Sequence, residues 1–229
     1  MKIEVHHSGK EFKSFRAEKV KSLFNAENGH EWRHTAELPI EDEGWQIGLV
    51  VGPSGSGKTS IGRQIWPESG IVNLSDGWND NLPLIDDIVP DAENMNVVTA
   101  ALSAVGLGDV PAWLRPFKVL SNGEQFRAGL ARLICEAPDK VVVDEFTSVV
   151  DRQIAKIGAA AFAKSWRKTG KRIVLLSCHY DVIEWLQPEW VYDTRVSEVK
   201  KKSQSGHLSS STFGRQTAVT GSFLKSITI

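Results

Sequence analysis

The 229-residue sequence contains only two cysteines, Cys135 and Cys178, and both lie in apolar segments. So small a number excludes the disulfide framework of a small secreted domain, and we expect both to be buried thiols. The sequence also lacks any apolar run that approaches the ~20 residues of a membrane-spanning helix. Residues 1–5 lack the apolar stretch of a secretory signal peptide. These absences predict a globular chain with a cytoplasmic location.

The composition, with 41% hydrophobic and 24% charged residues, is that of an ordinary globular protein. The length suits one domain with a smaller lobe. The net charge of −1 conceals an asymmetry, because residues 195–229 hold six Lys/Arg and one acid, a local +5 that leaves −6 on residues 1–194. This basic, Ser/Thr-rich segment is predicted to be a solvated tail, an ordered terminal strand, or a contact with an acidic partner.

One stretch identifies a ligand class. It reads Gly52-Pro53-Ser54-Gly55-Ser56-Gly57-Lys58-Thr59, follows an apolar run at 47–51, and leads through Ser60 into a predicted helix. A strand, a glycine-rich loop and a helix give the pattern G-x-x-x-x-G-K-[ST] its phosphate-binding context, since loop N–H groups and the helix dipole both face the phosphates. Lys58 is expected to reach the β- and γ-phosphates, and Thr59 to place its hydroxyl on Mg²⁺. The sequence therefore predicts binding of a nucleoside triphosphate.

The rest of the chain alternates between predicted strands and helices. Apolar strands are expected at 140–144, 172–177 and 190–192, with helices at 95–105, 123–136 and 154–166. Such alternation predicts an α/β fold with a mostly parallel sheet. In residues 1–51, short bursts of alternating polarity at 3–5, 12–15 and 20–24 predict short antiparallel strands.

Two acidic residues end the strand at 140–144. Asp144 and Glu145 follow three valines, which places both carboxylates at the carboxyl edge of a parallel sheet, where ligands bind. Asp144 suits a role in holding Mg²⁺ through water, and Glu145 suits a role in polarising an attacking water molecule.

A second motif narrows the family. The run Leu120-Ser121-Asn122-Gly123-Glu124-Gln125-Phe126-Arg127 resembles the signature of the ATP-binding cassette (ABC) ATPases, and it stands in the family's order between the phosphate loop and the acidic pair. The resemblance covers about residues 1–194. It implies a P-loop NTPase core, a small N-terminal antiparallel β part and a short helical lobe at about 77–135.

The resemblance also implies a mechanism with several assigned residues. ATP and Mg²⁺ would lie between two copies in a head-to-tail homodimer, with one copy's phosphate loop facing the other copy's signature. The family's dimer-face aspartate matches Asp151, and its switch histidine for the γ-phosphate matches His179, although a lone histidine at a strand end can be structural. Phe24 lies where the family stacks an aromatic ring on adenine, and a core phenylalanine is the alternative. Outside the phosphate loop, the resemblance implies that the nucleotide is bound by Phe24, Ser121, Asn122, Gly123, Glu124 and Asp151. The catalytic residues that it implies are Lys58, Glu145 and His179.

The sequence departs from the family pattern in four respects. No Gln follows the second core strand, so Asn79 and Asn81 are candidate stand-ins for sensing Mg²⁺ or water. Asn122 replaces a glycine, and Phe146 a proline. Only 62 residues separate Lys58 from Leu120, which shortens the lobe by which transporter cassettes grip a membrane partner.

Three functions follow from these features. The first is a soluble mechano-ATPase unconnected to transport, favoured by the short lobe and the missing Gln. The second is the ATP-binding subunit of a transporter, with a separate membrane protein as its partner. The third is an ATP-switched dimerising module that binds nucleic acid, or another unknown partner, through the basic tail.

Overall fold

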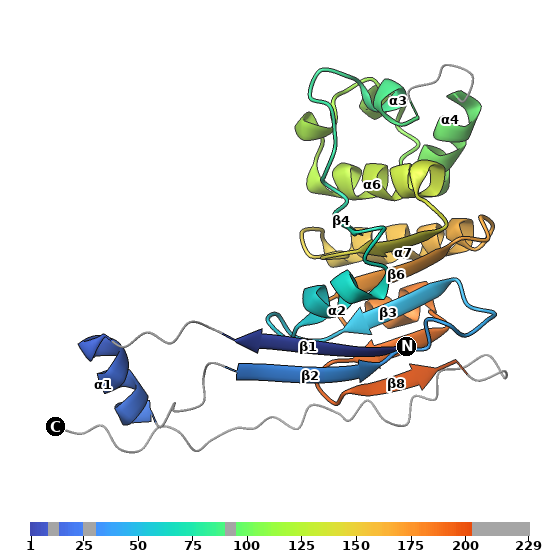
Figure 1. Ribbon diagram of the computed structural model, residues 1–229. Coiled ribbons are helices and arrows are strands. Elements are labelled where there is room, and N and C mark those ends of the chain that lie inside the picture. Colours follow the sequence, from blue (N-terminus) through green and yellow to red (C-terminus); the bar gives the residue numbers. More distant parts are fainter. Residues whose placement is uncertain (9–13, 25–30, 90–94, 203–229) are drawn as a thin grey trace.

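A six-stranded sheet forms the centre of the computed structural model, with a two-stranded sheet beside it and a helical lobe at one end (Figure 1). The structure describes residues 1–8, 14–24, 31–89 and 95–202, and at residues 7, 8, 24 and 31–33 it describes the backbone only. The strands are β1 (Lys2–Ser8), β2 (Glu31–Glu37), β3 (Ile47–Val51), β4 (Ile71–Val72), β5 (Lys140–Val143), β6 (Arg172–Ser177), β7 (Trp190–Asp193) and β8 (Glu198–Lys201). The helices are α1 (Phe15–Phe24), α2 (Lys58–Ile65), α3 (Leu84–Asp87), α4 (Met95–Ala104), α5 (Val110–Trp113), the 3-10 helix η2 (Phe117–Val119), α6 (Asn122–Glu136), α7 (Arg152–Trp166) and α8 (Val182–Leu186).

The central sheet has the strand order β4-β5-β6-β3-β7-β8. Strands β3 to β7 all run parallel, and β8 alone pairs antiparallel, with β7. All five residues of β3 are buried, as expected for a parallel strand covered on both faces. The predicted α/β fold with a mostly parallel sheet is confirmed.

Each face of the sheet has its own hydrophobic core. Leu49 and Leu175 face a core shared with α6, α7 and α8, whereas Val50 and Val174 face a core shared with α2, β1 and β2. This division follows from strand geometry, because successive side chains point to opposite faces. Each apolar run in the sequence therefore contributes side chains to both hydrophobic cores.

The N-terminal region contains the predicted antiparallel β part, as β1 pairs with β2. The bursts at 12–15 and 20–24, however, do not form strands: Phe15–Phe24 is helix α1, and residues 12 and 13 lie outside the described residues. Helix formers such as Ala17 and Glu18 explain this, together with two local contacts. The Ser14 hydroxyl accepts a hydrogen bond from the Ala17 N–H (3.2 Å), and Glu18 pairs with Lys21 (3.1 Å).

The helical lobe consists of short elements: α4 and η2 pack on α6, and α3 packs on α4 and α5. Trp78 stacks on Phe117 with 4.3 Å between ring centroids, and the Arg132 guanidinium of α6 lies 4.6 Å from the centre of the Trp78 ring. Leu102, Leu120 and Phe126 join the lobe to the core beneath it. Within the described residues, no helix is both long and apolar enough to cross a bilayer.

The central sheet extends beyond residue 194. Strand β8 pairs with β7 over four residues, from Trp190 opposite Lys201 to Asp193 opposite Glu198. Lys201 also forms an ion pair with Asp42 (2.6 Å). The first part of the segment that the sequence separates as a basic tail is thus a strand of the sheet. The remainder, residues 203–229, lies outside the described residues.

Gly48 on β3 provides a test of how closely the strands pack. It pairs with Trp190, and a Cβ atom placed on Gly48 would lie 2.0 Å from Cζ2 of the Trp190 ring, which is 1% exposed. We expect Gly48→Ala to lower the free energy of unfolding by about 1–3 kcal/mol, because the indole must move. Urea unfolding followed by tryptophan fluorescence measures the change. Gly108→Ala is the control, since a Cβ there meets nothing within 4 Å. Equal stability of the two variants would contradict the packing described here.

Candidate functional site

The loop between β3 and α2 has the geometry of an anion cradle. Gly55 and Gly57 both adopt left-handed backbone conformations (φ 76° and 84°), which residues with a Cβ atom rarely adopt. Gly57 is the N-cap of α2, and no side chain caps the helix there. The first N–H groups of α2 are therefore directed into the loop without a capping side chain, and a phosphate is their natural acceptor.

Lys58 crosses this loop from the first position of α2. Its Nζ donates to the carbonyl oxygens of Gly52 (2.9 Å) and Pro53 (2.7 Å). Partial burial lowers the pKa of Lys58, and the neighbouring carboxylates Asp144 and Glu145 act in the opposite direction. Both acceptors are neutral, so the ammonium charge faces the loop without being cancelled there.

Thr59 and Asp144 bring two oxygen ligands together. The Thr59 hydroxyl donates to Asp144 Oδ2 (2.7 Å), and the other oxygen, Oδ1, accepts from the Glu145 N–H (2.8 Å). The described residues contain no group of three or more His, Cys, Asp or Glu side chains that could hold a metal alone. A hydroxyl and a single carboxylate fit Mg²⁺, which keeps several waters and shares its remaining positions with phosphate oxygens.

These residues line one open cavity of about 430 Å³ at the carboxyl edge of the sheet. Its walls include Lys58, Thr59, Asp144 and Glu145. Cys178 also lines it and is exposed, so the expectation of a buried thiol is wrong for this residue because it lies just past the end of β6. Cys135 is half-buried, and burial raises its pKa to about 11.

The backbone after Asp144 is strained. Glu145 and Thr147 have φ values of 51° and 68°, and Thr147 is a β-branched residue that is only 2% exposed. Such conformations persist only when the surroundings hold them. The Phe146 N–H donates to the Leu176 carbonyl (2.9 Å), and Ser177 Oγ donates to the Phe146 carbonyl (2.9 Å), which fixes this loop to the end of β6.

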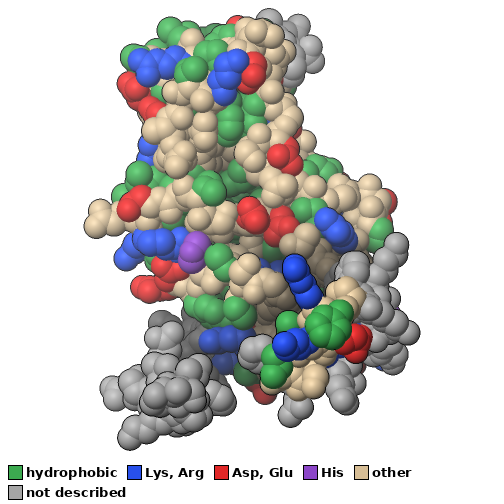
Figure 2. Space-filling model, turned by 90° about the vertical axis from the view of Figure 1, so that its left-hand side faces the viewer, with side chains coloured by type: hydrophobic (Ala, Val, Ile, Leu, Met, Phe, Trp, Pro, Cys, Tyr) green, Lys and Arg blue, Asp and Glu red, His purple; other side chains and the backbone are tan. Residues whose placement is uncertain are grey.

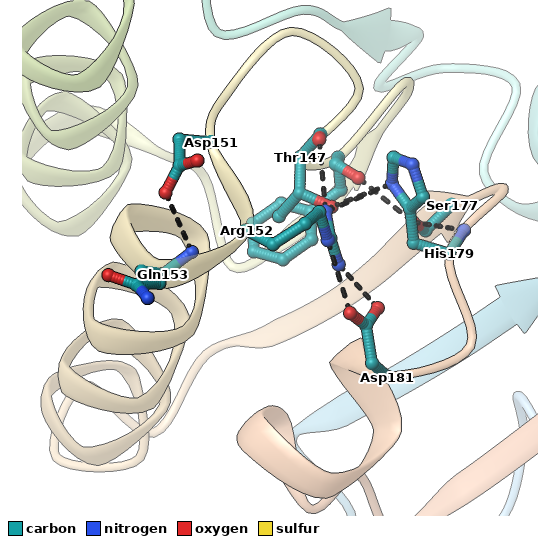
Figure 3. A network of polar contacts seen from close by, with 8 residues as sticks. Thr147, Asp151, Arg152, Gln153, Ser177, His179 and Asp181 are labelled. Atoms are coloured by element: carbon teal, nitrogen blue, oxygen red, sulfur yellow. Dashed lines mark hydrogen bonds and ion pairs between the residues drawn. The ribbon is translucent and has the colours of Figure 1, made fainter.

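His179 lies in a polar network next to that loop (Figure 3). Its ring nitrogen Nδ1 is 3.2 Å from Arg152 Nη1 and 3.3 Å from Thr147 Oγ1. The backbone N–H of His179 donates to Ser177 Oγ (3.1 Å). Arg152 also binds both carboxylate oxygens of Asp181. Burial, then the charge of Arg152, lower the pKa of His179, and Asp181 raises it. The histidine is therefore held in one orientation and favoured in its neutral form.

The signature residues form the start of α6. The Ser121 side chain accepts from the Glu124 N–H (3.4 Å), and Glu124 Oε2 accepts from both the N–H (2.8 Å) and the hydroxyl (2.7 Å) of Ser121. This reciprocal capping lowers the pKa of Glu124. Gly123 is buried, and a Cβ on it would lie 2.9 Å from Ile154 Cδ1, so a larger residue there would make the Ile154 side chain of α7 shift.

Asn122 lines a second cavity of about 400 Å³, which also includes Glu145 and Ser148. The two cavities share residues of the acidic loop, such as Glu145 and Ser148, whereas the phosphate-loop residues line only the first cavity. The signature and the phosphate loop of one chain thus remain separate.

Asp151 caps helix α7, since its Oδ1 accepts from the N–H groups of Gln153 (2.9 Å) and Ile154 (3.4 Å).

Two sequence candidates lie away from these cavities. Asn79 accepts from the Asn81 N–H (3.0 Å), and neither residue lines either cavity. Asn73, which the sequence reasoning missed, follows β4 directly and lines the second cavity with Asp144 and Glu145. Its position at the carboxyl end of a parallel strand was the signal. Phe24 ends helix α1, and its side chain lies outside the described residues.

Thr194 is another residue that the sequence reasoning missed. It follows β7, is 8% exposed, and its hydroxyl donates to Ser56 Oγ in the phosphate loop (2.7 Å). A Cβ on Gly52 would lie 1.8 Å from Thr194 Oγ1, so the loop and this hydroxyl are in direct contact. Sequence spacing could not have placed a threonine at position 194 against a loop at 52–57.

No family model matches the chain, whereas curated proteins similar to it are found. The teichoic acids export ATP-binding protein TagH of Levilactobacillus brevis is 25% identical over an alignment of 224 residues, covering 86% of this chain and 62% of that protein. The zinc import ATP-binding protein ZnuC of a Jannaschia species is 32% identical over 158 residues, covering 60% and 63%. The chain thus spans less than two thirds of the length of these relatives.

Solved structures show the same fold. A dimeric post-hydrolysis state of the ATP-binding cassette MJ0796 bound to ADP and Pi superimposes with a TM-score of 0.61 at 16% identity, covering 88% of this chain and 98% of that one. A dimeric structure of the same cassette gives a TM-score of 0.57, again at 16% identity, with 73% and 89% covered. In its motifs, strand order and fold, this chain is similar to the ABC-type ATP-binding cassettes.

Proposed function

We propose that this chain binds Mg-ATP and hydrolyses it between two copies arranged head to tail. The observation that carries the proposal is the convergence of Lys58, the Thr59–Asp144 pair and Glu145 on one cavity. Both relatives are named as ATP-binding proteins, which supports the choice of ATP among nucleoside triphosphates.

Each residue then has a distinct part. The uncapped N–H groups of α2 and the Lys58 ammonium bind the phosphates and offset the charge that develops in the transition state. Thr59 and Asp144 would hold Mg²⁺, which when bound supplies positive charge to the β- and γ-phosphate oxygens. Glu145 orients and polarises the attacking water. His179 donates a hydrogen bond to the γ-phosphate.

The dimer is proposed because one chain leaves the site incomplete. Ser121 and Asn122 lie at the exposed start of α6 and do not line the phosphate-loop cavity of their own chain. Supplied by a second copy, Ser121 and the N-terminus of α6 would face the γ-phosphate and close the cavity. ATP binding would then close the pair, and hydrolysis would open it.

Two alternatives are proposed for the process that this motion drives. A mechano-ATPase outside transport is favoured by the short elements of the helical lobe, in which α3 and α5 have four residues each. A transporter subunit is favoured by the import and export roles that the relatives' names carry. On the described part of the face in Figure 2, basic and acidic side chains are interspersed, so this face lends no support to nucleic-acid binding.

Lys58→Ala tests the phosphate site. Removal of the ammonium should weaken ATP binding by about ten-fold or more, because a charged hydrogen-bond donor to the phosphates is lost. Isothermal titration with a non-hydrolysable ATP analogue measures the affinity, and circular dichroism verifies the fold. Lys140→Ala is the matched control, since Lys140 is exposed at the opposite end of β5. Unchanged affinity in Lys58→Ala would remove the phosphate assignment.

Glu145→Gln tests the chemical step. The amide keeps the size of the side chain but cannot polarise water as a carboxylate does, so hydrolysis should slow by about 10²- to 10⁴-fold while ATP still binds. The variant should accumulate as a dimer with Mg-ATP on size exclusion. Proteins that co-purify with this trapped dimer distinguish a transporter subunit from a mechano-ATPase outside transport, because a membrane protein among them indicates transport. Wild-type turnover by Glu145→Gln would exclude Glu145 from the role proposed here.

A mixture of variants tests the composite site. Ser121→Arg should block the face offered to the partner's γ-phosphate, leaving ATP binding intact but preventing dimer formation. Mixed with Lys58→Ala, it can form a heterodimer with one complete site, and some ATPase activity should return. If activity needs both sites, Ser121→Arg/Glu145→Gln mixed with Lys58→Ala should still give an ATP-dependent dimer. Monomers in every mixture would show that the two motifs do not share a nucleotide.

A further inference from the structure

Arg152, the first residue of α7, joins two loops of the site. Its Nη1 donates to Thr147 Oγ1 (3.2 Å) and to the Thr147 carbonyl (3.4 Å) in the loop after β5. The same nitrogen lies 3.2 Å from Nδ1 of His179, in the loop after β6. Nothing in the sequence pattern gave this arginine a role. In Figure 3 the side chain lies between Thr147 and His179, with Asp181 on its other side.

The contact with His179 determines which ring nitrogen carries the proton. A guanidinium has only N–H donors and stays charged at any physiological pH, so the nitrogen facing it must accept. Nδ1 of His179 is therefore unprotonated, and in a neutral ring the proton must be on Nε2. Thr147 Oγ1, also near Nδ1, can donate to it as well. The second ring nitrogen points away from Arg152 (Figure 3).

Arg152 is itself held in place. Its Nε donates to Asp181 Oδ2 (3.1 Å), its Nη2 binds Asp181 Oδ1, and its guanidinium lies 4.7 Å from the centre of the Trp185 ring. A planar group fixed by a bidentate carboxylate and an aromatic face has few other orientations. The nitrogen that contacts His179 is thus positioned before any ligand arrives.

We propose that Arg152, clamped by Asp181, is a positioning residue that fixes His179 as the Nε2–H tautomer and keeps this donor directed away from the Arg152 network. The inference rests on the proposed function for its consequence, since the donor is the one offered to the γ-phosphate. Without Arg152, the proton can move to Nδ1, and a lone pair on Nε2 would then face the phosphate oxygens. The lowered pKa of His179 agrees, because burial and Arg152 both disfavour a second proton on the ring.

The tautomer can be measured in the full-length protein without ATP. The chain has six histidines, and His179→Gln identifies the ring signals of His179 in long-range ¹H–¹⁵N spectra. At pH 8, above the ordinary histidine pKa of about 6.5, the wild type should show a protonated Nε2 and an unprotonated Nδ1. A neutral ring with its proton on Nδ1 in the wild type would overturn the proposal, whatever the behaviour of any variant.

Arg152→Met tests the cause. It keeps an unbranched side chain over Trp185 but removes the donors, so a fraction of His179 should move its proton to Nδ1. The His179 pKa should also rise, because Asp181 then acts without the opposing cation. Arg132→Met is the matched control: Arg132 likewise pairs with a carboxylate, Glu136 (2.7 Å), and stacks on a tryptophan, Trp78. An Arg152→Met ring that behaves as in the wild type would reject the assignment.

Activity provides the second readout. In Arg152→Met, kcat for ATP hydrolysis should fall by about ten-fold or more while ATP affinity changes little, as expected when a histidine is left in the wrong tautomer. If Arg152→Met does not fold, Asp181→Asn releases the clamp and should shift the same ring signals. If even the wild type hydrolyses no ATP, the proposed function fails, while the ring measurement still decides the role of Arg152. A changed tautomer with unchanged kcat would limit that role to structure.

Discussion

The parallel pairing of β5, β6 and β3 is the constraint on which the site depends. Because the three strands are neighbours and run in the same direction, their carboxyl ends lie at one edge of the sheet. The phosphate loop follows β3, the acidic loop follows β5, and the loop with His179 follows β6. The hydrogen bond between Thr59 and Asp144 connects residues 85 positions apart in the chain, and it forms only because this register brings the two loops together. The buried apolar strands thus serve chemistry by fixing where polar loops begin.

Local signals in the sequence were sufficient wherever a short motif determines its own structure. The phosphate loop needs left-handed glycines at fixed offsets, and Gly55 and Gly57 supply them. The prediction failed at helix α1, because the short bursts of alternating polarity at 12–15 and 20–24 do not distinguish a strand from a helix. The capping by Ser14 becomes evident only in three dimensions. Sequence reasoning placed the stand-in for the missing Gln at Asn79 or Asn81, beyond the end of β4, whereas the cavity is lined by Asn73.

Two of the residues that sequence reasoning missed, Thr194 and Arg152, have contacts that are distant in the chain. Thr194 meets Ser56 across 138 positions, and Arg152 meets Asp181 across 29. No spacing rule predicts such pairs, since they result from the way that strands and helices pack. Arg152 also donates to the carbonyl and the hydroxyl of Thr147, which helps to hold a strained backbone that local preferences alone would release. The motifs of the candidate site are thus visible in the sequence, and the distant contacts that support them are not.

The two edges of the central sheet have a further consequence for how copies of the chain can meet. An open edge offers unpaired N–H and C=O groups to any other strand, which is a common route to aggregation. Here one edge is β4, only two residues long, and the other is β8, which carries Glu198, Lys200 and Lys201. A short edge and a charged edge both discourage strand addition. Any contact between copies of this chain is therefore directed to surfaces other than these two strand edges.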